Sequence, residues 1–212
     1  SLCFQLVPSS WGNLPVSPDP FHLSADADER LQRWISAVVE TPGLTSLPDV
    51  DKARRMLLED SLRGAEIVSE FEGPIVDVGS GGGAPGIPLA AALPDREVTL
   101  LEAERRKVDF LRRWEAELSN VRVVWGRAED QETDRFGVAV AKALAQPPVA
   151  AEWCLPLVRT GGAVVLWVGP TVEVDQVAQV ADRLAAAPPE LRDGLLVIRK
   201  LARTPEGFPR RP

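Results

Sequence analysis

Apolar positions in the first third of the chain repeat with the period of a helix. After Ser24, a residue type that caps helices, apolar side chains fall at i, i+3, i+4 and i+7: Leu31, Trp34, Ile35 and Val38. The pattern predicts one helix from Ser24 to about Pro42. A second helix, capped by Asp49 or Asp51, has this inner face: Ala53, Met56, Leu57, Leu62, Ile67 and Val68.

From Pro74 onward, short apolar runs alternate with helical patterns. In chain order the segments are 75–79, 86–93, 97–102, 104–118, 121–125, 137–142, 148–158, 163–168, 171–187 and 195–201. Five or six strands separated by helices predict an α/β fold with a mostly parallel, doubly wound sheet. Ligands in such sheets bind beyond the carboxyl ends of the strands.

A glycine-rich loop follows the first of these strands. Ile75–Val78 reads as a strand buried on both faces, and five glycines then lie within eight residues, from Gly79 to Gly86. Glycines allow sharp turns and a close approach of the backbone to a ligand, and Pro85 suits the first turn of a helix. Strand, glycine loop and helix together predict a nucleotide site.

Acidic residues near this loop bear on which nucleotide it binds. The dinucleotide pattern G-x-G-x-x-G fits only if Ala84 replaces the third glycine, whereas Asp77 followed by Gly79-x-Gly81-x-Gly83 resembles the first motif of S-adenosylmethionine-dependent methyltransferases. Glu102 ends the next strand and is placed to bind the ribose hydroxyls of either cofactor. The predicted cofactor-binding residues are Asp77, Gly79, Ser80, Gly81, Gly83, Pro85 and Glu102, with Arg127, Ala128 and Glu129 at the adenine. Ordinary αβ turns are the alternative.

Composition excludes several classes of protein. The net charge of −7 argues against a general nucleic-acid binder, although Arg210 and Arg211 belong to a basic C-terminal patch that could neutralise phosphates. Cys3 and Cys154 have no metal-ligand spacing, so we expect no metal and a reducing compartment such as the cytoplasm. No apolar run approaches the ~20 residues of a membrane-spanning helix.

Several stretches stand in the order found in one known family. They are Gly43-Leu44-Thr45, Asp60-Ser61-Leu62, the loop from Gly79 to Gly86, Leu101-Glu102, 107–111, 126–129 and the terminal 204–211. Over roughly residues 30 to 212 the chain resembles the glucose-inhibited division protein B family, bacterial small-subunit ribosomal RNA guanine-7-nitrogen methyltransferases. The Asp-Ser-Leu sequence and the terminal Pro-Arg-Arg are the most specific parts of the resemblance.

The chain departs from the family pattern near the expected acceptor site. Leu57 stands where the family has histidine, Lys142 where it has arginine, Val168 where it has lysine, and Ala84 where its loop has phenylalanine. Residues 188–194 look too short for the extra strand and hairpin that the family has before its last strand, so we expect that hairpin to be missing.

The resemblance implies a Rossmann-like class I methyltransferase fold with two N-terminal helices and S-adenosylmethionine as cofactor. It implies Asp60, Ser61 and Lys142 as catalytic residues, and 16S ribosomal RNA of the small subunit as partner, bound by Lys142, Arg210 and Arg211. We expect an irregular segment over 1–23 and one domain over 24–212, made of helices (24–73), α/β core (74–202) and basic tail (203–212). We also expect a monomer.

Three rival functions remain open at this stage. One is a divergent relative that keeps the donor pocket but methylates a small molecule or another RNA. Another is a relative that binds the cofactor or RNA without turnover, and the most distant is a nicotinamide oxidoreductase. Methyl incorporation separates an enzyme from a binder, and salt-dependent binding of small ribosomal subunits separates RNA from small-molecule substrates.

Overall fold

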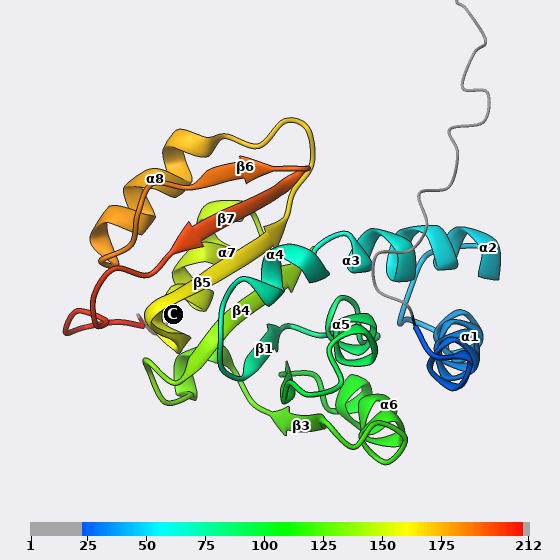
Figure 1. Ribbon diagram of the computed structural model, residues 1–212. Coiled ribbons are helices and arrows are strands. Elements are labelled where there is room, and N and C mark those ends of the chain that lie inside the picture. Colours follow the sequence, from blue (N-terminus) through cyan, green and yellow to red (C-terminus); the bar gives the residue numbers. More distant parts are fainter. Residues whose placement is uncertain (1–22, 210–212) are drawn as a thin grey trace, which may run out of the picture.

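A twisted seven-stranded sheet runs through the molecule in the order β3-β2-β1-β4-β5-β7-β6 (Figure 1). The computed structural model describes residues 23–209. The strands are β1 Ile75–Val78, β2 Val98–Glu102, β3 Val121–Trp125, β4 Phe136–Lys142, β5 Val158–Trp167, β6 Glu190–Arg192 and β7 Leu195–Arg199. The first five are parallel, β7 is antiparallel to β5, and β6 is antiparallel to β7. The predicted doubly wound sheet is confirmed, with more strands than expected.

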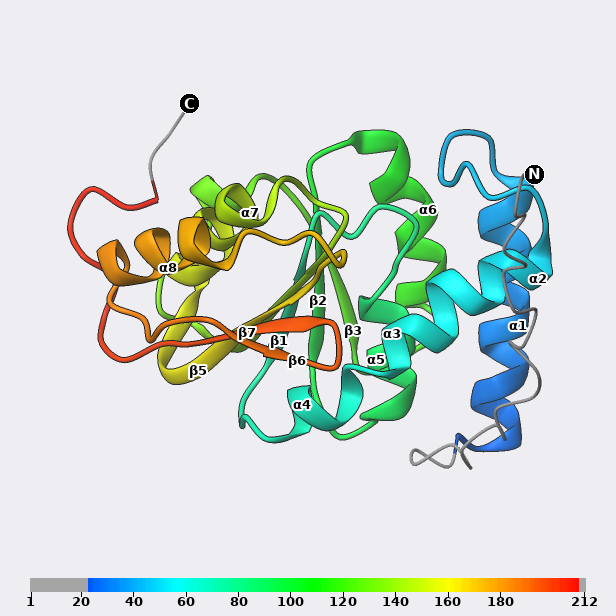
Figure 2. The ribbon, with the colours of Figure 1, turned by 90° about the horizontal axis from the view of Figure 1, so that it is seen from above.

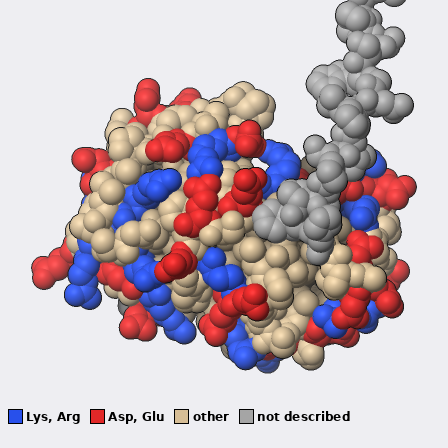
Figure 3. Space-filling model, in the orientation of Figure 1, with Lys and Arg blue, Asp and Glu red and all other residues tan. Residues whose placement is uncertain are grey.

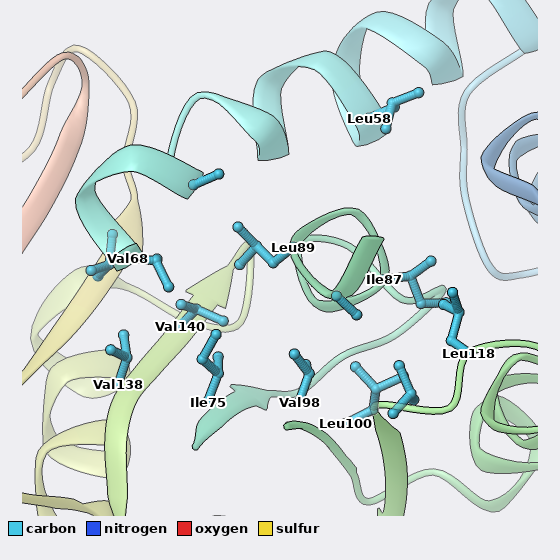
Figure 4. Close-up of a cluster of buried hydrophobic side chains, with 14 of the residues drawn as sticks. Leu58, Val68, Ile75, Ile87, Leu89, Val98, Leu100, Leu118, Val138 and Val140 are labelled. Atoms are coloured by element: carbon cyan, nitrogen blue, oxygen red, sulfur yellow. The ribbon is translucent and has the colours of Figure 1, made fainter. Parts of the chain in front are cut away.

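Alternate residues of the central strands point to opposite faces of the sheet, and a different set of helices covers each face. Ile75 packs with α5 (Gly86–Ala92), α6 (Arg105–Glu115) and the N-terminal helices. Its neighbour Val76 packs with α7 (Pro147–Cys154) and α8 (Val174–Arg183) on the other side. Figure 4 shows the first of these clusters, and Figure 2 shows the helices on the two sides of the sheet. Burial on both faces explains why the strands read as continuous apolar runs.

The N-terminal helices begin where the sequence predicts. Ser24 caps α1 (Ala25–Glu40) by accepting a hydrogen bond from Ala27 N at 3.1 Å, and Asp49 caps α2 (Val50–Ala53) by accepting from Lys52 N at 2.7 Å. The second helix is not regular, however. It continues from α2 into a π-helical turn, η1 (Arg54–Glu59), and then α3 (Asp60–Leu62), before α4 (Ala65–Ser69). π-helical turns are rare in proteins as a whole, but those that occur often lie at functional sites.

The expectation that residues 188–194 lack a hairpin is wrong. β6 and β7 pair through Leu191 and Leu196 and through Arg192 and Leu195, so that only Asp193 and Gly194 form the turn. Their φ values of +50° and +76° are those of a two-residue hairpin turn, for which Asp-Gly is a preferred sequence. The hairpin fits in this short stretch because its turn needs only two residues.

The described part of the C-terminal tail is bound to the sheet rather than free. Thr204 donates from its backbone N and its Oγ1 to Oδ1 of Asp134, at 3.0 and 2.9 Å. Lys200, which is buried, donates from Nζ to Leu155 O at 3.2 Å and to Thr204 Oγ1 at 3.1 Å. These groups lie at the amino ends of β4 and β5, the edge opposite the predicted ligand site.

The described residues include neither a membrane-spanning helix nor a cluster of metal-ligand side chains. In residues 23–209 no helix is long and apolar enough to cross a membrane. The same part of the chain has no cluster of three or more histidine, cysteine or acidic side chains that could hold a metal ion. Cys154 is buried, and burial raises the pKa of its thiol. Cys3, the segment 1–22 and the tail residues Arg210 and Arg211 lie outside the described residues.

Candidate functional site

The glycine loop leaves β1 at the carboxyl edge of the sheet and leads into α5. Gly79, Gly81 and Gly83 have φ values of +71°, +55° and +106°, a region that side chains with a Cβ rarely adopt. A Cβ on Gly83 would lie 2.4 Å from Ile87 Cδ1, whereas one on Gly81 would meet only Gly79 O, at 3.9 Å. Space therefore opens beside Gly81, where a ligand can approach the backbone.

Asp77 holds the far end of the loop from beneath. Its side chain is buried, and its Oδ2 accepts a hydrogen bond from Gly86 N at 2.9 Å. Its Oδ1 is also buried and has no hydrogen-bond partner among the described residues. Burial raises the pKa of Asp77 to about 7, with a smaller contribution from the nearby carboxylate of Glu102 and against the opposing effect of the Gly86 hydrogen bond. Asp77 therefore reaches a ligand only through the loop that it supports.

Glu102 joins the end of β2 to the same loop. Its Oε2 accepts from Gly81 N at 2.8 Å and its Oε1 accepts from Glu104 N at 2.8 Å. The side chain is only 7% exposed. Each carboxylate oxygen has a second lone pair, so Glu102 can hold the loop and still accept from the hydroxyls of a ribose.

Ser80 and Pro85 have backbone roles in this turn. The Ser80 hydroxyl donates to Asp77 O at 2.9 Å and is buried, which closes the turn between the strand and the loop. Pro85 precedes the first residue of α5 and its carbonyl accepts from Leu89 N at 3.0 Å. Both residues therefore shape the loop.

A cavity of about 150 Å³ lies between the ends of β1, β2 and β3, where the adenine is expected. Its lining includes Glu102, Arg127, Ala128 and Glu129 together with Trp153. Glu129 is buried and its Oε1 lies 3.3 Å from Arg127 Nη2, whose side chain is 55% exposed. The structure thus brings Glu102 and the stretch Arg127–Glu129, both predicted to bind the cofactor, to one cavity.

A larger cavity of about 360 Å³ lies on the other side of Gly79. The glycine loop and Glu102 form one wall, and the rest of the lining comes from other elements: Val38, Leu44, Leu57, Lys107, Lys142, Ala143 and Leu144. Leu144 lines both cavities, and its Cδ1 would lie 2.4 Å from a Cβ on Gly79. The two cavities are therefore adjacent compartments along one edge of the sheet.

Lys142, at the end of β4, lines the larger cavity and contacts the irregular helix. Its Nζ donates to Oδ2 of Asp60 and to the carbonyl of Met56, which belongs to the π-helical turn. Asp60 is held further by Arg63 Nη1 at 2.5 Å, and its carbonyl accepts from Trp167 Nε1 at 2.8 Å. Two of the three predicted catalytic residues are thus in contact, although 82 residues separate them in the chain.

Ser61, the third predicted catalytic residue, points into its own helix. Its side chain is fully buried, and its hydroxyl donates to Leu57 O at 2.5 Å. Leu57, where the family has histidine, lines the larger cavity beside Lys142. Val168, where the family has lysine, instead lines a small neighbouring cavity that shares Ala143 and Leu144 with the larger one. The residues that differ from the family pattern therefore line neighbouring cavities.

Sequence reasoning missed one contact to the loop. Trp34 of α1 appeared only as part of an apolar stripe, yet its indole Nε1 donates to Gly82 O at 2.8 Å and the side chain is fully buried. The periodicity of α1 showed that Trp34 faces inward, but nothing in the sequence showed what its N–H would meet.

The charged face of α6 is solvated. Lys107 lies 2.9 Å from Glu104, and Asp109 lies 3.5 Å from Arg105 and 4.0 Å from Arg112. On the face of the molecule seen in Figure 3, basic and acidic side chains are likewise interspersed. Lys107 differs from its neighbours because it also lines the larger cavity.

The fold is that of the class I S-adenosylmethionine-dependent methyltransferases. Solved structures with the same fold include a SAM-dependent O-methyltransferase from Thermotoga maritima, with a TM-score of 0.52 at 15% identity over 70% of this chain and 67% of that one. A "predicted O-methyltransferase" from Agrobacterium tumefaciens matches with a TM-score of 0.50 at 19% identity over 62% of this chain and 77% of that one.

The chain belongs to the rRNA small subunit methyltransferase G family, whose sequence profile matches residues 28–187. A relative of that name from Synechococcus elongatus is 35% identical, over 86% of this chain and 84% of its own. Another from Clostridium beijerinckii is 30% identical, over 93% of this chain and 90% of its own. The resemblance found in the sequence is confirmed, and with it the S-adenosylmethionine-dependent chemistry.

Proposed function

We propose that this protein transfers the methyl group of S-adenosylmethionine to the 7-nitrogen of a guanine in 16S ribosomal RNA of the small subunit. The family to which the chain belongs supports the RNA class, and the relatives are named ribosomal RNA small subunit methyltransferases. The observation that carries the proposal within the molecule is the pair of adjacent compartments, one beside Arg127–Glu129 and one beside Lys142.

The chemistry suits a site without a general base. The 7-nitrogen of guanine offers a lone pair and carries no proton, so the enzyme has mainly to align the acceptor with the methyl–sulfur bond and exclude water. No histidine lines either compartment in the described part of the chain. An Asp60–Lys142 pair can serve such a reaction by positioning alone.

The donor would lie along the carboxyl edge of the sheet. Its adenine would occupy the smaller cavity beside Ala128 and Glu129, its ribose would meet Glu102, and its methionine part would follow the glycine loop into the larger cavity. This assignment follows from the size and continuity of the two compartments. It makes Gly81, beside which the space is open, the point of closest approach.

The acceptor side is assigned to Lys142, Asp60 and Ser61. Lys142 would contact the guanine carbonyl or a phosphate, which requires its ammonium to exchange its contact with Met56 O or Asp60 for the RNA. Ser61 would act from within its helix through Leu57. We assign Arg210 and Arg211 to phosphate contacts from their charge.

We propose further that residues 24–212 act as one domain and as a monomer in the cytoplasm, where ribosomal subunits are present. The core cluster that joins α1 and α4 to the sheet supports a single domain. The large apolar side chains that are well exposed in the described residues stand on different segments: Val50, Met56, Trp125, Val149, Leu191 and Leu201.

Methyl transfer from labelled S-adenosylmethionine tests the function directly. Small ribosomal subunits from a strain that lacks the endogenous activity are the acceptor, and 7-methylguanine is located by borohydride reduction and aniline cleavage of the RNA. We expect label in 16S RNA and one new cleavage site. Label only in a small-molecule fraction would favour a methyltransferase that acts on a small molecule. Cofactor binding without any label would favour a non-catalytic relative.

A further inference from the structure

The glycine loop is held by three side chains from three different elements. Asp77 of β1 binds Gly86 N, and Glu102 of β2 binds Gly81 N. The third is Trp34 of α1, which donates to Gly82 O at 2.8 Å. The two acids reach backbone N–H groups at either side of the turn, whereas the indole is the one side chain of these three that holds a loop carbonyl.

Trp34 is placed so that its N–H has no alternative partner in solvent. The side chain is 0% exposed, and its Nε1 lies 3.1 Å from the position of a Cβ on Gly83. Val38, one turn later on α1, packs at 3.4 Å from the equivalent position on Gly82 and also lines the larger cavity. Helix α1 thus contacts two consecutive glycines of the loop, and a shift of the helix would move both.

We infer that Trp34 is a positioning residue for the methyl donor: its indole N–H holds Gly82 so that the loop keeps the conformation in which Gly81 can approach the cofactor. The inference rests on the proposed location of the donor beside Gly81. It gives the N-terminal helix a part in cofactor binding, although the helix lies outside the α/β core.

The expected size of the effect follows from hydrogen-bond energetics. A buried neutral hydrogen bond contributes a net factor of about 2 to 12 to the equilibrium that it biases. If the bond favours the binding conformation of the loop, its loss reduces the fraction of competent molecules and raises the apparent Kd by the factor by which that fraction falls, which is at most about 12. Linkage requires the reciprocal effect, so cofactor binding must strengthen the Trp34–Gly82 bond.

The chain offers a matched control in Trp114 of α6. Trp114 belongs to the same core cluster, and its indole Nε1 is buried without a hydrogen-bond partner among the described residues. Trp34→Phe and Trp114→Phe therefore make the same chemical change in one core, but only the first removes a hydrogen bond to the loop.

Calorimetry with S-adenosylmethionine, combined with hydrogen exchange of the peptide over residues 79–87, tests the inference. We expect Trp34→Phe to raise Kd by up to about 12-fold and to speed exchange in that peptide, while Trp114→Phe leaves both at the wild-type level. Equal Kd values and equal exchange in the two variants would show that Trp34 only fills the core.

A measurement on the unaltered protein covers the case in which Trp34→Phe does not fold. With indole-¹⁵N tryptophan, S-adenosylhomocysteine should slow solvent exchange of the Trp34 N–H and leave that of Trp114 unchanged. No difference between the two indoles would overturn the inference, with methyl transfer to ribosomal RNA unaffected. If the wild type binds neither cofactor form, the donor assignment itself fails, and this inference fails with it.

Discussion

The buried carboxyl group of Asp77 should make the stability of this protein depend on pH in an unusual direction. The pKa of Asp77 is raised from 3.8 to about 7, chiefly by burial. The unfolded chain therefore releases this proton near pH 4, whereas the folded chain keeps it until about pH 7. Between these values the folded state binds more protons, so the contribution of Asp77 to stability is present in acid and is lost as the pH rises.

The size of this loss follows from the two pKa values. Each pH unit between 3.8 and about 7 corresponds to about 1.4 kcal/mol, which gives a total of about 4 kcal/mol. Asp77→Asn imitates the protonated carboxyl group, because its amide oxygen can still accept from Gly86 N and it carries no charge. The free energy of unfolding of the variant relative to the wild type should therefore rise by about 4 kcal/mol from pH 4 to pH 8.

Urea unfolding of both proteins at a series of pH values measures this difference. Because every other titrating group is common to the two proteins, the difference isolates position 77. We expect a slope of about 1.4 kcal/mol per pH unit up to pH 7 and a plateau above it. A difference that stays constant within about 0.5 kcal/mol from pH 4.5 to pH 8, the precision of such measurements, would refute the reasoning.

Three further predictions concern the donor and acceptor sites. Gly81→Val should leave the circular dichroism spectrum unchanged and abolish S-adenosylmethionine binding in calorimetry, because valine is strained at a φ of +55° and its side chain would fill the open space where the cofactor must approach; unchanged affinity would reduce the loop to a structural turn. Glu102→Ala should weaken S-adenosylmethionine by about 1–3 kcal/mol, by calorimetry, without creating affinity for NAD, and the opposite preference would contradict the methyltransferase assignment. Val168→Lys should raise both the affinity for small ribosomal subunits and its salt dependence, by nearly one unit of slope in filter binding for the one added phosphate contact, whereas Lys142→Arg keeps the charge and should leave the slope unchanged; no change in slope with Val168→Lys would remove that position from the RNA surface.

Sequence patterns predicted the structure correctly where a residue type has one main physical use. The apolar run of β1, the glycines with positive φ and the caps Ser24 and Asp49 all follow from local rules, and the structure confirms them. Glu102 and Arg127 could be placed at one edge of the sheet because parallel strands bring their carboxyl ends together.

The patterns failed where a side chain has several uses or a contact spans the chain. Trp34 has an apolar ring and a polar N–H, and the apolar periodicity of its helix indicates only that the ring faces inward. The hairpin at Asp193-Gly194 was missed because its strand β6 has three residues, although the Asp-Gly turn itself was visible. The Met56 carbonyl of the π-helical turn meets Lys142, a contact between residues 86 positions apart, which no local pattern contains.

The position of β7 in the sheet has a consequence for synthesis of the chain on the ribosome. β5 lies between β4 and β7, so before residues 195–199 emerge its outer edge has no partner, and Leu155 and Asp134 lack the groups that bind them, Lys200 and Thr204. Unpaired strand edges promote aggregation, and they persist longest where the partner is translated last. A nascent chain stalled before β7 should therefore depend on chaperones until residues 195–199 emerge and complete the sheet.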